Sequence, residues 1–216
     1  MLHGRGGLMA SSMIHIVVAN ELNKKMDKDK TQLLIGTIAP DISKLVGDVK
    51  KHSHFIDDDG DIPNLDRFLN KYKKNLDDDF VLGYYIHLYT DYLWFKYFIP
   101  EIIDKDLITK LDGTVVKCTP GMLKMYIYSD YTNLNTRLLE EYDLDLKIFY
   151  NELPEFNNII EEIPMDRMDI IVNKAGEIIE NSKIFKDLVF DIDNVKQFVD
   201  LAVQLIESNL RDLNVI

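Results

Sequence analysis

The strongest constraint on the fold is the spacing of apolar side chains, which recur at intervals of three and four residues. Near the end of the chain this pattern comprises Val195, Phe198, Val199, Ala202, Leu205 and Ile206. Such spacing is typical of one buried face of an α-helix. At 216 residues the chain is long enough for one sizeable core and short for two domains. The sequence therefore predicts an all-α fold, a single-domain helical bundle over residues 13–216.

Proline, glycine and capping residues set the expected helix boundaries. The first helix begins at Ser11 or Ser12, whose hydroxyl groups suit a helix N-cap. Residues 47–62 are expected to form a loop, and residues 105–119 an extended loop around Thr114. The predicted helices are residues 11 or 12 to 26, 30–38, a short helix opened by Pro40, 65–72, 80–103, 120–142, a short helix after Pro154, 164–180 and 193–213.

The chain is acidic, with a formal net charge of −12 and no long cluster of lysine or arginine. Such a surface repels nucleic-acid phosphates and anionic lipid headgroups, so a general nucleic-acid binder is disfavoured. Cys118 is the only cysteine, which makes an intrachain disulfide impossible. This composition fits a reducing cytoplasm, and it predicts a packed thiol rather than a catalytic one.

The N-terminal residues 1–12 lack the apolar segment of a secretory signal, and we expect them to be a tag remnant or a disordered N-terminus. No uninterrupted apolar run reaches about 18 residues, the length that a membrane-spanning helix needs. The sequence therefore predicts no transmembrane helix and a cytoplasmic location.

The histidines are unevenly distributed along the chain. Four of the five lie between Met13 and Asp91, and none follows Asp91. Histidine and carboxylate groups are the ligands of zinc and of related divalent metals. We therefore predict a metal site assembled from several helices, mainly within residues 13–131. The four histidines are His15, His52, His54 and His87.

The pair His87 and Asp91 is separated by four residues, which places both side chains on one face of the predicted helix 80–103. Both can bind one ion, or Asp91 can bridge two ions. Gly83 lies one turn earlier and allows another element to approach closely. The alternative is a buried histidine that is hydrogen-bonded to its own aspartate.

Three further residues are weaker candidates when each is taken alone. His15 lies among aliphatic residues, where the alternative is a core histidine with satisfied hydrogen bonds. His54 lies in the predicted loop, where exposure to solvent is the alternative and His52 is another candidate ligand. Asp41 follows Pro40, and its alternative role is to stabilise the first turn of a helix.

A polar stripe at helical spacing lies on the predicted helix 120–142. Arg137 belongs to it and is a candidate contact for a substrate phosphate, because its planar guanidinium group carries several donors. A solvent-exposed helix face explains the stripe equally well. The stripe consists of Tyr126, Asp130, Asn133 and Arg137.

The order of the candidate residues along the chain is more specific than any one of them. This series resembles the zinc-dependent phospholipase C family over residues 11–100, and weakly through residues 128–131. The resemblance implies an all-helical phospholipase C/nuclease fold, with metal ligands presented from several helices onto one cleft. The series comprises a histidine early in the first helix, Gly36-x-x-x-Pro40-Asp41, Ser53-His54-Phe55 and Gly83-x-x-x-His87-x-x-x-Asp91.

The resemblance also implies a role for each residue of the series. His54, His87 and Asp91 would bind one zinc ion. His15 would bind a neighbouring metal, with Asp91 as the bridge, and Asp41 would ligate metal or activate water. The implied chemistry is metal-assisted hydrolysis of a phosphoester or phosphodiester, acting on a small phosphoester or a phospholipid-like substrate.

The chain departs from that family at two points. The secreted phospholipases use a tryptophan at the mature N-terminus as a ligand, whereas Trp94 is the single tryptophan here. They also use a later histidine pair and a glutamate, whereas no histidine follows His87. Asp130 would at most partly replace this site, so one or two zinc ions are expected rather than three. Manganese or iron accepts the same ligand set.

The missing ligands motivate a second hypothesis, a non-catalytic helical binding or scaffold protein that retains a structural or vestigial metal site. A helical phosphohydrolase of the HD type is disfavoured, because that type needs an adjacent His-Asp pair and the sequence contains none.

Overall fold

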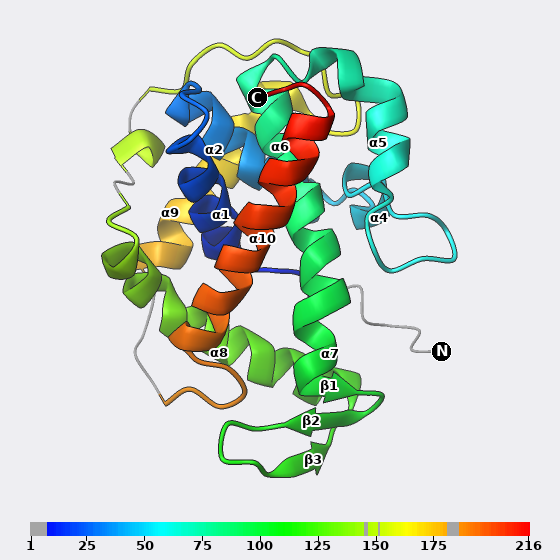
Figure 1. Ribbon diagram of the computed structural model, residues 1–216, viewed down its shortest axis with the longest axis vertical. Helices are drawn as coiled ribbons and strands as arrows, with labels where there is room; N and C mark the ends of the chain where they lie inside the picture. The colour runs from blue at the N-terminus through cyan, green and yellow to red at the C-terminus, as the bar shows by residue number, and fades with distance from the viewer. Residues whose placement is uncertain (1–7, 145–146, 151, 181–185) are drawn as a thin grey trace.

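The longest helices of the N-terminal half begin where a side chain accepts hydrogen bonds from free backbone N–H groups. Ser11, Asp29 and Asp78 do so ahead of α1 (Ser12–Asn23), α2 (Lys30–Ile38) and α6 (Asp79–Leu93). This computed structural model describes residues 8–144, 147–150, 152–180 and 186–216 (Figure 1). Between α2 and α6 lie a 3-10 turn (Ala39–Ile42), α3 (Ser43–Val46), α4 (Lys50–Ser53), α5 (Leu65–Tyr72) and a 3-10 turn (Lys73–Asn75).

The C-terminal half contributes two long helices that flank the first half. Thr119 caps α8 and Asp191 caps α10, the latter with a reciprocal capping box through Asn194. Both α8 and α10 pack against α1, so the two halves share one apolar core. The elements are a π-helical turn (Trp94–Phe98), α7 (Ile99–Ile102), β1 (Ile103–Asp104), β2 (Leu107–Thr109), β3 (Val115–Lys117), α8 (Pro120–Glu141), 3-10 turns (Lys147–Phe149 and Met165–Arg167), α9 (Met168–Glu180) and α10 (Ile192–Asp212).

The all-α prediction needs one correction, because residues 103–117 form a small antiparallel sheet in the order β1-β2-β3. Ile103 pairs with Ile108, and Ile108 pairs with Val116. The sheet lies beyond α7 at one end of the molecule (Figure 1). Ile108 is fully buried and anchors it to the core. Strands of two or three residues are too short to show alternation in the sequence, so the segment was expected to be a loop.

Two other local predictions are wrong, whereas the expected helix 80–103 is confirmed: α6, the π-helical turn and α7 together span Asp79–Ile102. The expected loop 47–62 contains α4. Residues 152–164, where a short helix was expected after Pro154, contain no helix, and side chains of α5 contact the end of this segment. The hydroxyl of Tyr72 donates to Glu162 at 2.7 Å and accepts from the Glu161 N–H at 2.9 Å.

The N-terminal prediction also needs correction for residues 8–12, since residues 1–7 lie outside the described residues. Leu8, Met9 and Ala10 are 2%, 5% and 6% exposed, and Ser12 already belongs to α1. This segment is therefore part of the core rather than a disordered tail. Apolar burial and tertiary hydrogen bonds place it there, and no local periodicity marks it in the sequence.

The helices α2 and α6 cross with their backbones in direct contact. A Cβ atom added to Gly36 would lie 2.1 Å from the carbonyl oxygen of Phe80, and one added to Gly83 would lie 2.1 Å from that of Leu33. Only glycine allows the two backbones to approach this closely. Among the described helices, none is long and apolar enough to cross a membrane.

Candidate metal centre

Five side chains from four elements converge in the core beside this crossing. His15 lies on α1, Asp41 in the 3-10 turn after α2, His54 directly after α4, and His87 and Asp91 on α6. The three histidines and Asp91 are fully buried, and Asp41 is 9% exposed. The structure therefore brings together five residues from four separate parts of the sequence. Their atoms form two groups that can hold a metal ion, and His87 belongs to both.

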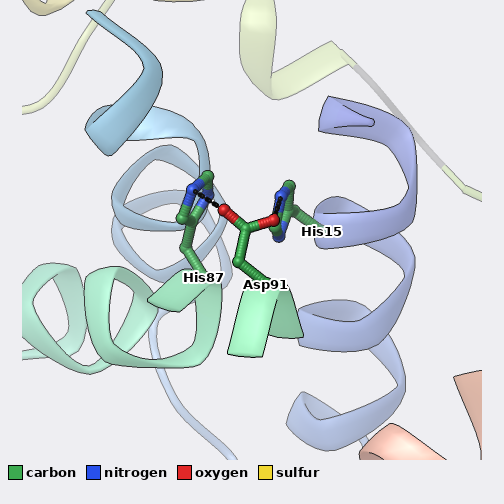
Figure 2. A group of neighbouring side chains, drawn as sticks. All are labelled: His15, His87 and Asp91. Carbon is green, nitrogen blue, oxygen red and sulfur yellow. Dashed lines mark ion pairs between the residues drawn. The ribbon is translucent and has the colours of Figure 1, made fainter. Parts of the chain in front are cut away.

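The first group consists of His15, His87 and Asp91, and Figure 2 shows the carboxylate of Asp91 between the two imidazole rings. The Oδ1 atom of Asp91 lies 3.3 Å from the Nε2 of His15, and its Oδ2 lies 3.4 Å from the Nε2 of His87. The four-residue spacing on α6 directs Asp91 toward His87. With one oxygen turned to each imidazole, Asp91 has the orientation of a bridging ligand.

The second group consists of Asp41, His54 and His87. The Nε2 of His54 lies 3.4 Å from the Oδ1 of Asp41 and 3.9 Å from the Oδ2 of Asp91. It also lies 3.3 Å from the Nε2 of His87. The short helix α4 produces this position, because it ends at Ser53 and turns the next side chain into the core.

Backbone carbonyl groups fix the tautomer of two of the imidazoles. The Nδ1 of His87 lies 2.7 Å from the carbonyl oxygen of Thr37, and the Nδ1 of His54 lies 3.1 Å from that of Lys50. A carbonyl oxygen only accepts, so in the neutral ring each Nδ1 carries the hydrogen and each Nε2 presents a lone pair. The two Nε2 lone pairs then face each other at 3.3 Å. A cation between the two Nε2 atoms would remove this repulsion. Histidine ligands of metals normally donate the hydrogen of the other ring nitrogen to an acceptor such as a backbone carbonyl, as His54 and His87 do here.

Several polar atoms of the cluster lack hydrogen-bond partners. Both ring nitrogens of His15 and the Oδ2 of Asp91 are buried and have no hydrogen-bond partner among the residues that the structure describes. The ring of His15 stacks on that of His87, with centroids 3.8 Å apart and planes inclined by 15°. Buried polar groups in native proteins are nearly always satisfied. Metal coordination would satisfy these atoms, so the residues present fit a divalent ion.

The environment also sets the charges that a cation would meet. Burial lowers the pKa of His54 to about 3, and burial together with His87 lowers the pKa of His15. Burial alone would raise the pKa of Asp41, but Lys44 and His54 outweigh it and hold that pKa well below its ordinary value. The histidines hold the pKa of Asp91 low in the same way. Unprotonated imidazoles and ionised carboxylates are the forms that bind metal.

The comparisons with models of known protein families, with curated proteins and with solved structures found no match. The interpretation of this centre therefore rests on the residues and their geometry.

Three residues considered from the sequence do not join either group. Asp130 is buried but accepts hydrogen bonds from the N–H groups of a neighbouring segment, so its oxygens already have partners. Arg137 pairs with Asp187 at 2.6 Å instead of facing the cluster, and His52 is exposed. The donors to Asp130 are the backbone N–H groups of Leu188 at 2.8 Å, Val189 at 2.7 Å and Phe190 at 3.1 Å.

Lys44 is the functional candidate that the sequence analysis missed. Its Nζ contacts the Oδ1 of Asp41 one helical turn away. Burial lowers the pKa of Lys44, but the neighbouring Asp41 more than offsets this and raises it, so the amine stays charged. The available signal was the three-residue spacing from Asp41, which places both side chains on one side of the helical turn.

The metal-free protein is expected to lose stability as the pH falls from about 6.5 to 4. The unfolded chain, with an ordinary histidine pKa of 6.5, binds more protons in this interval than the fold, in which the pKa of His54 is about 3. The contribution of the neutral His54 imidazole to the free energy of unfolding is therefore fully present above pH 6.5. Below that pH it declines by about 1.4 kcal/mol per pH unit until the pH approaches 3. Thermal melts of chelator-treated protein across this range measure the decline.

The matched variants for this measurement are His54→Gln and His52→Gln. The first removes the buried imidazole and should flatten the decline, whereas the second alters an exposed ring and should leave it unchanged. A melting temperature that stays constant between pH 7 and pH 4.5 in the unmodified chain would contradict the expectation.

Proposed function

We propose that the protein is a metal-dependent hydrolase that cleaves a phosphoester or phosphodiester, with zinc as its metal. The observation that supports this most is the convergence of three imidazoles and two carboxylates in two overlapping groups that could hold a metal ion. When bound there, a divalent ion lowers the pKa of a water molecule and neutralises charge on phosphoryl oxygens. The order of these residues along the chain is the basis of the proposed relation to the phospholipase C/nuclease fold.

A cavity beside the cluster gives a small substrate access to it. Its volume is about 340 Å³, and both Asp41 and Lys44 line it. The other residues that line the cavity are both apolar and polar, and they include Tyr128, Tyr131 and Lys174. Small-molecule sites typically combine a mostly apolar wall with a few placed polar groups. The volume and lining fit a small phosphoester with an apolar organic group.

Asp41 is the residue that connects the cavity to the cluster. It belongs to the second metal-binding group and also lines the cavity, whereas the other four ligands are fully buried. Its low pKa keeps the carboxylate ionised, so it accepts a hydrogen bond and orients a water molecule at the cavity wall. The charged amine of Lys44 beside it is placed to hold a phosphoryl oxygen.

The test is hydrolysis of bis-p-nitrophenyl phosphate and p-nitrophenyl phosphate by the zinc-loaded protein. Lys44→Met is expected to lower kcat/KM about a hundredfold, the effect typical of removing one donor to developing negative charge, while bound zinc is retained. Lys24→Met is the matched control, because Lys24 is an exposed lysine of the α1 terminus paired with Glu21. Equal rates in both variants would contradict the role of Lys44.

The alternative is a non-catalytic protein with a structural metal, and the full burial of four ligands favours it. Structural sites are closed, whereas catalytic sites keep an open position. Chelation would then lower the melting temperature, while the zinc-loaded protein would turn over no member of a wide phosphoester panel. That pair of results would replace the hydrolase proposal with the structural one.

A further inference from the structure

The segment of residues 8–11, called here the N-terminal strap, is tied by hydrogen bonds of its backbone to α6, to the π-helical turn that follows α6, and to α8. The indole Nε1–H of Trp94 donates to the carbonyl oxygen of Leu8 at 3.1 Å. The hydroxyl of Tyr131 donates to the carbonyl oxygen of Met9 at 2.7 Å. The next residue, Ala10, donates its N–H to the Oδ1 of Asp91 at 3.1 Å.

This last hydrogen bond determines how the carboxylate of Asp91 is turned. A carboxylate rotates about its bond to Cβ, and α6 alone does not fix that angle. The N–H of Ala10 holds Oδ1 on the side of His15, so that Oδ2 is left facing His87. The strap thereby selects the orientation in which one oxygen of Asp91 faces His15 and the other faces His87.

The two anchors of the strap are well suited to keep it in place. Trp94 is fully buried and Tyr131 is 6% exposed. Burial holds the pKa of Tyr131 well above its ordinary value, so its hydroxyl keeps its proton and remains a donor. The π-helical turn after Asp91 begins at Trp94 and carries the indole toward Leu8. Backbone groups of a buried segment require such partners.

We propose that Tyr131 and Trp94 are positioning residues of the metal centre, which act on Asp91 through the backbone of residues 8–10. Neither belongs to a metal-binding group. The inference rests on the proposed metal centre, but not on hydrolysis. The strap residues Met9 and Ala10 also line the cavity beside Asp41. The same segment therefore orients the carboxylate of Asp91 and forms part of the cavity wall.

The test compares Tyr131→Phe with Tyr85→Phe. Each variant removes one hydroxyl from a buried tyrosine, and Tyr85 lies on α6 but donates to Asn209, away from the cluster. Zinc affinity is measured by competition with a chromophoric chelator, and the visible spectrum of the cobalt-loaded protein reports the ligand geometry. Tyr131→Phe is expected to weaken zinc binding about 10–100-fold, as loss of a group that orients a ligand does, and to shift the cobalt spectrum.

Tyr85→Phe is expected to keep the zinc affinity and the cobalt spectrum of the unmodified protein, even if its melting temperature falls as much as that of Tyr131→Phe. Trp94→Phe removes the other anchor and should change both readouts in the same direction as Tyr131→Phe. Unchanged affinity and spectrum in Tyr131→Phe would overturn the inference, as would equal losses in Tyr131→Phe and Tyr85→Phe. Metal binding without turnover of any phosphoester would reject the hydrolase proposal and leave the positioning role intact.

Discussion

Replacement of His87 by alanine is expected to leave the protein without bound zinc, whereas replacement of His15 should leave about one ion per chain. His87 belongs to both metal-binding groups, but His15 belongs to only one. The affinity should fall by more than about a hundredfold, because loss of a group that merely orients a ligand already costs roughly 10–100-fold. Elemental mass spectrometry of the zinc-loaded, dialysed protein gives the stoichiometry directly.

The control for this experiment is His52→Ala, which removes an exposed histidine two residues before His54. It should retain the full zinc content. Circular dichroism of the His87→Ala protein should remain helical, because the core around α6 is supplied by other side chains. Full zinc content in the His87→Ala protein would show that the ion binds elsewhere and would remove the basis of the proposed function.

Gly83→Ala is expected to destabilise the fold by about 3 kcal/mol, the upper part of the usual range for overpacking, and to disturb the metal centre. The added Cβ would lie 2.1 Å from the carbonyl oxygen of Leu33 and 3.0 Å from the backbone nitrogen of Thr37. Both neighbours are backbone atoms of α2, so the helices must separate. Separation breaks the contact between Thr37 and His87 that fixes the imidazole. Chemical denaturation and zinc affinity measure the two effects.

Gly176→Ala is the matched control, since Gly176 is also a buried glycine within a helix. Among the described residues, its added Cβ would meet only the side chain of Tyr150, at 3.8 Å or more, an ordinary contact. This variant should be neutral or slightly stabilised, because alanine has the better helix propensity. Equal stability of the two variants would mean that α2 and α6 tolerate a wider separation than their backbone contact indicates.

Local signals in the sequence predicted much of what positions the site. The capping hydroxyl of Ser11 and the proline at position 40 mark helix boundaries that the structure reproduces within a few residues. The four-residue spacing of His87 and Asp91 predicted a shared helix face, and Gly83 predicted a close approach, which α2 makes. The helix boundaries and the shared face depend on residues near in the sequence, where helix geometry determines the outcome. The glycine at position 83 predicted that an element would approach closely, but not that this element is α2.

Features that depend on distant residues were not predicted. The antiparallel sheet of residues 103–117 has strands of two and three residues, too short for a periodic pattern. Asp130 was weighed as a ligand, yet its oxygens accept hydrogen bonds from residues 188–190, a partnership that no local spacing indicates. The strap was expected to lie outside the fold because its only signals are the hydrogen-bond donors of Trp94 and Tyr131.

The anchoring of the strap by α8 has a consequence for the order of events during protein synthesis. All five candidate ligands precede position 92, but Tyr131, which holds Met9, is translated 40 residues after Asp91. At roughly 5–20 residues per second, the ribosome needs about 2–8 seconds to bridge that gap. During this interval the imidazoles and carboxylates are already present on the nascent chain, together with Trp94, while the strap still lacks its anchor on α8. A metal ion that binds to the centre during translation would therefore bind before Tyr131 fixes the strap.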